Sequence, residues 1–120
     1  MTVVNLINVA TITPVMAAGA VTTSRASIVD VAADKVAKIN SLIIANIDGT
    51  NAADITVEVS VDNGSNYVAI AKTVSVAADS SLIVVGKDNG FYLDETDLLA
   101  VTASAASDLT YLVSYELMTD

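Results

Sequence analysis

Two short segments hold the carboxylates that could bind a metal ion. Asp62-Asn63-Gly64, followed by Asn66, resembles the start of a calcium loop, in which oxygen ligands recur along twelve residues. The twelfth position should be acidic, but here it is Thr73. Residues 94–97 hold Asp, Glu and Asp, a cluster that is also typical of a solvated turn between strands. The sequence therefore predicts two polar turns, with no metal site and no cofactor site.

The residue types of most catalytic sites are missing. The chain has no histidine and no cysteine, which removes the commonest general base, the commonest zinc ligand and the thiolate nucleophile. Serine is plentiful, but no Gly-x-Ser-x-Gly motif occurs, and nothing marks out a Ser–Lys pair. The five glycines form no phosphate-binding loop. We therefore predict no catalytic residue, no small-molecule substrate and no enzymatic activity.

The charge balance bears on the partners. Fourteen acidic and five basic residues give a formal net charge of -9. The basic residues are separated from one another: they are Arg25, Lys35, Lys38, Lys72 and Lys87. A nucleic-acid backbone or an anionic membrane requires clustered cations, so neither is an expected partner. The acidic excess suits solubility or a basic surface on a protein partner.

The composition is apolar for a small soluble monomer. Hydrophobic residues make up 53% of the chain and charged residues 16%, although a small domain has to cover itself with polar side chains. No apolar stretch reaches the roughly 20 residues of a membrane-spanning helix. We therefore expect part of the apolar surface to be buried between subunits.

The second half of the chain has the period-two pattern of β-strands. Ile55, Val57, Val59 and Val61 share one phase, with polar residues between them. The turn at residues 62–65 predicts a hairpin that returns over residues 67–76. Further short strands are predicted at residues 82–85, 91–93 and 99–103. The last strand has one face formed by Leu109, Tyr111, Val113, Tyr115 and Leu117; Tyr111 is expected in the core, and the place of Tyr115 is left open.

The first half is less regular. Residues 38–47 predict a strand with Ile39, Ile43, Ala45 and Ile47 in one phase and further apolar residues in the other, as in a central or covered strand. Residues 26–31 predict another strand, and residues 31–38 a loop. Residues 1–23 lack the basic start of a signal peptide. With Pro14 and Gly19 as breaks, they predict either an arm that reaches a neighbour or an edge strand.

Together these patterns predict an all-β protein. We expect a single antiparallel β-sandwich or jelly-roll-like domain over residues 24–120, with an extended N-terminal segment over residues 1–23. The turns recur at the short spacing that such folds need.

From about residue 38 onward the chain resembles small virion proteins of tailed bacteriophages, especially those of marine and cyanobacterial hosts. The resemblance rests on residues 39–50 and 52–57, on residues 91–97, and on the closing residues 111–116 with their Val-Ser-Tyr-Glu segment. It implies a virion protein that is present in many copies, on the capsid surface after assembly in the host cytoplasm.

The resemblance implies a capsid decoration (cement) protein that is a homotrimer and contacts the major capsid protein. Two alternatives stay open at this point. One is a neck, tail or fibre component, and the other is a secreted calcium-dependent binding module that would use residues 94–97. Light scattering and a calcium titration separate the binding module from the two virion roles. The gene neighbourhood or virion mass spectrometry separates those two roles from each other.

Overall fold

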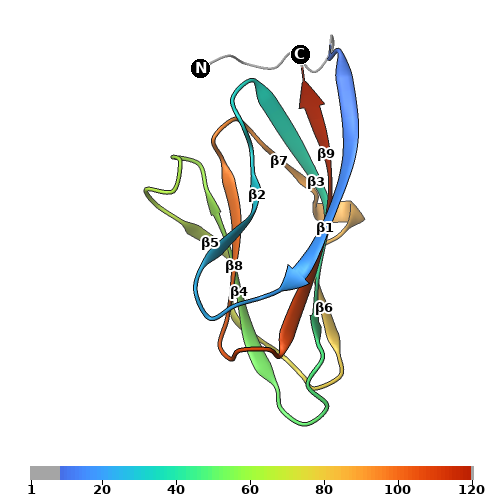
Figure 1. Cartoon of the computed structure of the whole chain (residues 1–120), viewed down its shortest axis with the longest axis vertical. Helices are drawn as coiled ribbons and strands as arrows, with labels where there is room; N and C mark the ends of the chain where they lie inside the picture. Colours follow the sequence, from blue (N-terminus) through green and yellow to red (C-terminus); the bar gives the residue numbers. More distant parts are fainter. Residues whose placement is uncertain (1–8, 120) are drawn as a thin grey trace.

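The computed structural model describes residues 9–119. These residues form nine β-strands and one short 3-10 turn (Figure 1). The strands are β1 (Thr11–Ala20), β2 (Ala26–Asp30), β3 (Lys35–Asn46), β4 (Ala53–Ser60), β5 (Val68–Val76), β6 (Ser81–Val85), β7 (Phe91–Leu93), β8 (Leu98–Ala103) and β9 (Leu109–Thr119), and the turn is η1 (Lys87–Asn89). Within the described range there is no helix long and apolar enough to cross a membrane.

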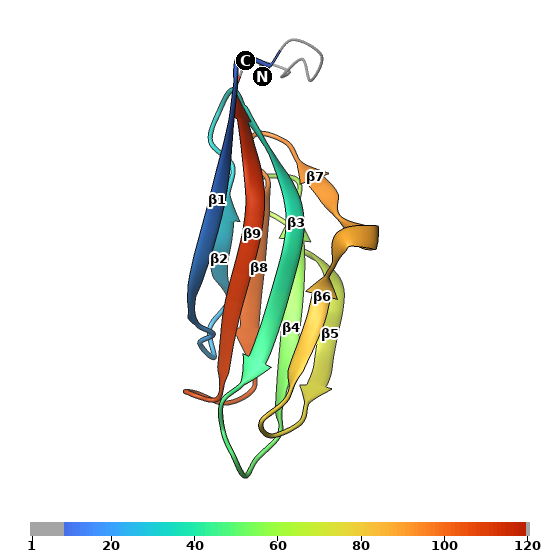
Figure 2. The same ribbon diagram turned by 90° about the vertical axis from the view of Figure 1, so that its right-hand side faces the viewer.

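The strands form two antiparallel sheets that pack face to face, so the predicted β-sandwich is confirmed. The five-stranded sheet has the order β1-β9-β3-β6, with β7 also paired to β3. The four-stranded sheet has the order β2-β8-β4-β5. Figure 2 shows β1 and β2 at one lateral edge of the sandwich and β5 and β6 at the other. The long, narrow shape measures 49 × 27 × 21 Å.

The core lies between the two sheets and consists of aliphatic side chains. Ile39, Leu42 and Ile44 of β3 face Ile55 of β4 and Leu99 of β8, and all five are fully buried. The central strands β3, β4, β8 and β9 contribute most of this core because both of their edges are paired. Tyr111 packs against the core as predicted, and so does Tyr115.

A bulge in β3 corrects the phase predicted for this strand. The pairing with β9 shifts between Ile39 and Ser41, and an extra residue at this point reverses the faces of all residues that follow. Ile39 is therefore buried with Leu42 and Ile44, whereas Ile43 lies on the opposite face and Ile47 is exposed beyond the strand end. The single phase predicted for residues 39–47 is wrong, but the central position of the strand is confirmed.

The strand β1 runs through both predicted breaks. It pairs with β9 from Thr11 to Ala20, and Pro14 is opposite Glu116. A proline is tolerated here because β1 is an edge strand. Gly19 leaves room for Tyr111, since a Cβ atom at this position would lie only 3.3 Å from the tyrosine ring and hydroxyl. Residues 1–8 of the predicted N-terminal arm lie outside the described residues, and the boundary at residue 23 stays a prediction.

The hairpin of β4 and β5 forms as predicted, with one correction. Ile55 and Val57 are buried, but β4 ends at Ser60 and Val61 is 71% exposed. The turn begins one residue earlier than the alternation indicates because the Ser60 hydroxyl accepts a hydrogen bond from the Gly64 N–H (2.8 Å). Gly64 has a φ of 87°, which glycine adopts without strain.

Candidate interaction surfaces

The carboxylate of the first candidate calcium segment is used to close its own turn. Asp62 Oδ1 accepts hydrogen bonds from the Ser60 hydroxyl (2.9 Å) and the Asn66 N–H (2.8 Å), and Oδ2 accepts one from the Asn66 side-chain amide (2.9 Å). The bonds from Asn66, followed by the bond from Ser60, lower the pKa of Asp62. The arrangement is a turn cap, and its oxygen atoms already have donors.

The acidic turn at residues 94–97 faces inward, which differs from the solvated turn that the sequence predicted. Glu95 and Asp97 are buried. Glu95 Oε2 accepts a hydrogen bond from the Asp34 N–H (2.8 Å), and Asp97 Oδ2 accepts one from the Asp94 N–H (2.9 Å). Burial raises the pKa of Asp97, and the neighbouring Asp94 charge adds to this effect. The Glu95 carboxylate therefore ties the β7–β8 turn to the loop before β3, and the Asp97 carboxylate closes the turn itself.

Residues 9–119 contain no group of three or more acidic side chains arranged to hold a metal ion. In the same part of the chain, every buried polar side chain has a hydrogen-bond partner. The described structure therefore offers no unpaired buried group that points into a cavity, which is the usual sign of a chemical site. The candidate functional features of the described structure are therefore its surfaces.

The outer face of the five-stranded sheet is apolar and nearly free of charge. Cross-strand neighbours form rows on this face, and three successive rows contain no charged residue. They are Ala20-Thr110-Ala45-Ser81, Ala18-Leu112-Ile43-Ile83 and Met16-Ser114-Ser41. Met16 and Ile83 are 67% and 65% exposed. A shallow hollow of about 510 Å³ lies over the first two rows, where Ile43 and Leu112 line it.

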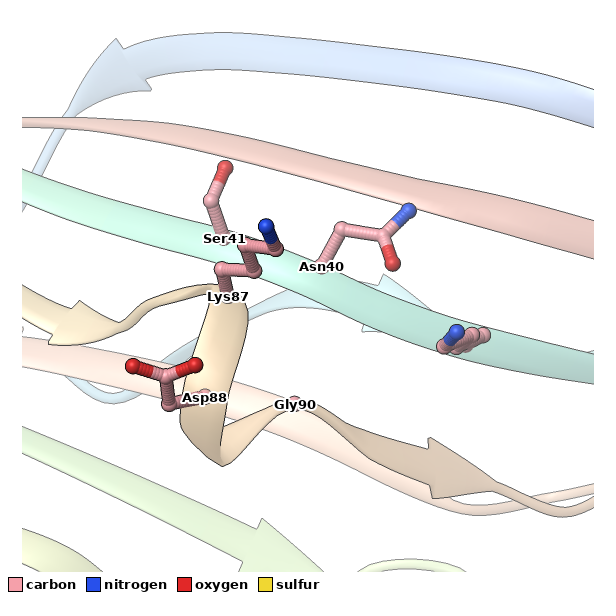
Figure 3. Close-up of a pocket in the computed structure, with 6 residues that line it drawn as sticks. Asn40, Ser41, Lys87, Asp88 and Gly90 are labelled. Carbon is pink, nitrogen blue, oxygen red and sulfur yellow. The ribbon is translucent and has the colours of Figure 1, made fainter.

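The next row on this face carries the first charges. Lys38 of β3 is opposite Glu116 of β9, and Glu116 Oε1 accepts a hydrogen bond from the Asn40 side-chain amide (3.1 Å). Lys38 and Lys87 line a hollow of about 570 Å³ together with Asn40 and Ser41. In Figure 3, Asn40 and Ser41 rise from β3 and Lys87 comes from the η1 turn. The apolar rows therefore end at a rim that carries both signs of charge, with Lys38 and Lys87 beside Glu116 and Asp88.

The η1 turn can lie this close to β3 because of one glycine. A Cβ atom on Gly90 would approach the Ile39 carbonyl oxygen to 2.8 Å, which is closer than such atoms come in proteins. Lys87 and Asp88 belong to the same turn and line the hollow beside Lys38. A side chain at position 90 would push the η1 turn, which carries Lys87, away from β3, which carries Lys38.

A second apolar surface is a groove between the two sheets at the β5–β7 edge. Its volume is about 340 Å³, and its lining residues are Val59, Val61, Val68, Ile70, Phe91, Tyr92 and Leu93. Val68 is 66% exposed, although an aliphatic side chain of this kind normally packs in a core. Figure 1 shows the β4–β5 hairpin leaning away from β7 at this end of the sandwich.

The outer face of the four-stranded sheet is polar. Glu58 of β4 accepts two hydrogen bonds from Arg25, from Nε to Oε1 (2.9 Å) and from the second guanidinium nitrogen to Oε2 (3.1 Å). The Arg25 guanidinium carbon also lies 3.9 Å from the centre of the Tyr67 ring, in a cation–π contact. Thr56 of β4 accepts a hydrogen bond from the Thr73 N–H (3.1 Å).

Sequence reasoning predicted surplus apolar surface but not its location. The side chains that form it, such as Ile43, Leu112 and Ile83, come from strands that are distant in the sequence. The apolar residues in both phases of residues 38–47 were the one signal of an exposed apolar face. No sequence pattern indicated the groove at the β5–β7 edge.

No protein-family model and no curated protein matches this chain. A chain from a structure described as "Bacillus endospore appendages form a novel family of disulfide-linked pili" is similar, with a TM-score of 0.50 and 18% identity over 91% of this chain and 87% of that one. Two structures of a pentameric capsid protein isolated from metagenomic phage sequences have TM-scores of 0.40 and 16% identity. They cover 96% of this chain, which spans 67% and 62% of theirs. The first of these likenesses concerns the fold, a two-sheet sandwich.

Proposed function

We propose that this chain is a multi-copy structural protein of a tailed-phage virion, and that it is a capsid decoration (cement) protein. In this role it forms a homotrimer on the head surface and contacts the major capsid protein. The observation that carries the proposal is the uncharged apolar outer face of the five-stranded sheet. Its mechanism is the burial of this face in many symmetric contacts, which stiffens the shell.

The outer face is large enough for a specific contact. Strands β1 and β9 have 10 and 11 residues. With a strand spacing of about 4.8 Å and a rise of about 3.3 Å per residue, three strands of this length and the five-residue β6 give the whole outer face, including the row with Lys38 and Glu116, an area of roughly 500 Å². A partner that covers this face therefore buries roughly 1,000 Å² in total, the lower limit for a specific interface.

The distribution of charge favours this face over the others. The chain carries a net charge of -9, so copies of it repel one another wherever their acidic surfaces meet. Three rows of the outer face have no charge, so copies can meet there without this repulsion, and the rim balances Lys38 and Lys87 with Glu116 and Asp88. The acidic remainder of the chain complements a basic shell.

Two further points support a structural role over an enzymatic one. The sequence has no histidine and no cysteine, and the carboxylates of its two acidic segments are engaged in turn hydrogen bonds. The resemblance of residues 39–50, 52–57, 91–97 and 111–116 to tailed-phage virion proteins favours the virion as the location.

The first experiment measures the mass of the purified protein by light scattering. A stable oligomer, with the mass of three chains, is the expected result. Ile83→Lys places a charge in the middle of the apolar rows and should dissociate the oligomer. Ile47→Lys is the matched control, because Ile47 is the same residue type with a similar exposure (62%) but lies beyond the end of β3. A monomeric parent, or equal dissociation by both variants, would contradict the proposal.

The second experiment locates the protein in the particle. Mass spectrometry of purified virions should detect it in a copy number comparable with that of the major capsid protein. A gene next to the major capsid gene agrees with a decoration protein. A low copy number, or a gene among tail genes, would instead identify a neck or tail component.

A further inference from the structure

We propose that copies of this chain join head to tail through the two free edges of the five-stranded sheet, with β1 of one copy pairing antiparallel to β6 of the next. This inference rests on the proposed assembly into a homotrimer, and it names the contact that closes the trimer as a ring. The partner is a second copy of this chain, and it is recognised by main-chain hydrogen bonds between two strand edges.

The free edges of the five-stranded sheet lack the features that prevent pairing between copies. In the described structure β1 and β6 each pair on one side only, and neither strand contains a charged residue. The free edges of the other sheet are protected. On that sheet β2 has Asp30 and a register shift, and β5 has Lys72, further register shifts and Thr73 with a φ of 47°. Charges and bulges are the usual barriers to edge-to-edge pairing.

The backbone of β1 presents its free groups at every second residue. The Val21 N–H donates a hydrogen bond to the Leu109 carbonyl (2.9 Å), and such bonds alternate along an antiparallel pair. The odd-numbered residues of β1 therefore bond β9, and the even-numbered residues direct their N–H and C=O groups outward. Pro14 is one of these outward residues and has no N–H. The edge of β1 is consequently blunted at Pro14 and open at residues 16–20.

The same alternation identifies the free groups of β6. The Asn46 N–H donates a hydrogen bond to the Ser80 carbonyl (2.8 Å), so Leu82 also bonds β3, whereas Ser81 and Ile83 direct their backbone groups outward. The register of β6 against β3 shifts only after Ile83. The open part of this edge is therefore the stretch from Ser81 to Ile83.

The open groups of the two edges lie at the same level of the sheet. Ala20 and Ser81 are the two ends of one cross-strand row, and Ala18 and Ile83 are the two ends of the next. The sheet is four antiparallel strands wide here, so β1 and β6 run in opposite directions (Figure 2). A rotation about an axis parallel to the strands therefore brings each of these residues opposite its row partner in the next copy, without sliding. Each junction gains about four main-chain hydrogen bonds, since each such pair exchanges two.

Two observations identify the partner as another copy of the chain. The chain has a net charge of -9, and copies that meet at these edges bring no like charges together. The two edges also match each other in level, direction and phase, which is the requirement for a head-to-tail contact that closes as a ring. A pairing of β1 with a second β1 would leave both β6 edges open. In the ring, the uncharged rows of the outer face continue from one copy into the next.

The test uses disulfide trapping, because the sequence contains no cysteine of its own. The double variant Ala20→Cys with Ser81→Cys is mildly oxidised and its mass is measured without reduction. Within one chain the two positions are three strand spacings apart, about 14 Å, which is too far for a disulfide. Between paired copies their Cα atoms are about 5.5 Å apart, which a disulfide spans. The expected product is a covalent species of three chains.

The matched control is Ala26→Cys with Ser81→Cys. Ala26 is also an exposed alanine at the same lateral edge of the sandwich, but it begins β2 in the other sheet. The control should give a several-fold lower yield of crosslinked chains. Equal yields from the two double variants would overturn the proposal. A ladder of products longer than three chains would overturn the closed ring in favour of an open filament.

A single variant tests the pairing of β1 with a second β1. Residue 18 lies in the middle of the open stretch of β1, so a two-fold pairing of these stretches places the two copies of Ala18 opposite each other. In the proposed ring they are far apart, and Ala18→Cys alone should give few disulfide dimers. Efficient dimer formation by this variant would overturn the ring.

A proline substitution tests the main-chain hydrogen bonds. Ala18→Pro removes an outward N–H and spares the pairing with β9, as Pro14 does in the parent. It should raise the protein concentration needed for assembly several-fold, as measured by light scattering. Ile12→Pro is the matched control, because residue 12 is also outward on β1 but lies beyond Pro14 and outside the open stretch. Circular dichroism checks that both variants are folded, and equal assembly of the two would contradict the proposal.

The outcomes separate this inference from the proposed function. A parent protein that is monomeric at all concentrations removes the proposed function. A parent that forms an oligomer, but whose variant with Ala20→Cys and Ser81→Cys gives no more crosslinked product than the Ala26→Cys control, removes the edge contact alone.

Discussion

The two sheets have opposite outer faces although both cover the same core. On the five-stranded sheet, Ile43, Leu112 and Ile83 lie side by side in a row without charge. On the four-stranded sheet, the corresponding outward positions of β4 are Thr56 and Glu58. Glu58 is bound by Arg25, which also covers Tyr67. The outer face of the four-stranded sheet is therefore covered with polar groups, and that of the five-stranded sheet is not.

This difference separates the apolar residues that stabilise the fold from those that we propose to act in assembly. The inward residues of both sheets are aliphatic because they form the core. An outward aliphatic residue adds little to the stability of the single chain, because its surface stays in contact with water. In the proposed assembly, the outward aliphatic residues of the five-stranded sheet gain their burial from a partner.

The largest expected effect is a difference in stability between variants of two adjacent residues that lie on opposite faces of β3. Leu42→Ala removes a fully buried side chain from the core and should lower the free energy of unfolding by about 2 to 5 kcal/mol. Ile43→Ala lies on the outer face and should lower it by no more than about 1 kcal/mol in the dissociated chain. Urea unfolding of dilute protein measures both values. Equal losses would show that Ile43 is a core residue.

A smaller effect is expected at the seam between the sheets. The buried Asn46 of β3 donates hydrogen bonds to the carbonyl oxygens of Val76 (2.9 Å) and Asn51 (3.0 Å). Asn46→Ala leaves these groups without a donor and should cost about 1 to 3 kcal/mol. Asn40→Ala is the matched control, because Asn40 also belongs to β3 but bonds Glu116 at the outer face. The same urea assay checks both, and a larger loss for Asn40→Ala would contradict the comparison.

The loss of a polar contact on the outer face of the four-stranded sheet should have a smaller effect on stability. Glu58→Gln weakens the pair with Arg25. The Glu58 side chain is mostly covered, but about half of the Arg25 side chain is in contact with water, so we expect a small fall in the melting temperature. The difference from the parent should disappear in high salt, which screens such pairs. Glu116→Gln, on the other sheet, serves as the comparison and should show no salt-dependent difference. A large, salt-independent effect of Glu58→Gln would mean that the pair is structural.

The smallest effect concerns pH at the turn before β8. Burial raises the pKa of Asp97 in the folded chain, so the folded state holds this proton to a higher pH than the unfolded state does. The contribution of Asp97 to stability therefore falls as pH rises from about its ordinary value of 3.8 through the raised value.

Asp97→Asn should remove this loss, because an amide oxygen can still accept the hydrogen bond from the Asp94 N–H. The variant should gain stability relative to the parent at neutral pH and lose that advantage below the ordinary pKa. Asp88→Asn, at an exposed position, controls for the change in net charge. Urea midpoints at both pH values measure the effect, and a pH-independent difference would contradict it.

The sequence by itself determined the fold class and most strands. The alternation at residues 55–59 and 109–117, and the Asn- and Gly-containing turn at residues 62–65, predicted strands and one hairpin that the structure confirms. Alternation is a local property of neighbouring residues, so one sequence is sufficient to identify it. The lack of histidine and cysteine likewise limits the chemistry that this chain can perform in any fold.

Only the tertiary structure decided which side chains face the core and which lie on the outer faces of the sheets. The bulge between Ile39 and Ser41 reversed the phase of the rest of β3, and the inward turn of Glu95 and Asp97 depends on Asp34, about sixty residues earlier in the chain. The apolar rows join β1, β9, β3 and β6, which are far apart in the sequence. Which strands become neighbours, and where a register shifts, depends on contacts between distant segments. These contacts, and the surfaces that they create, are not encoded in any local pattern.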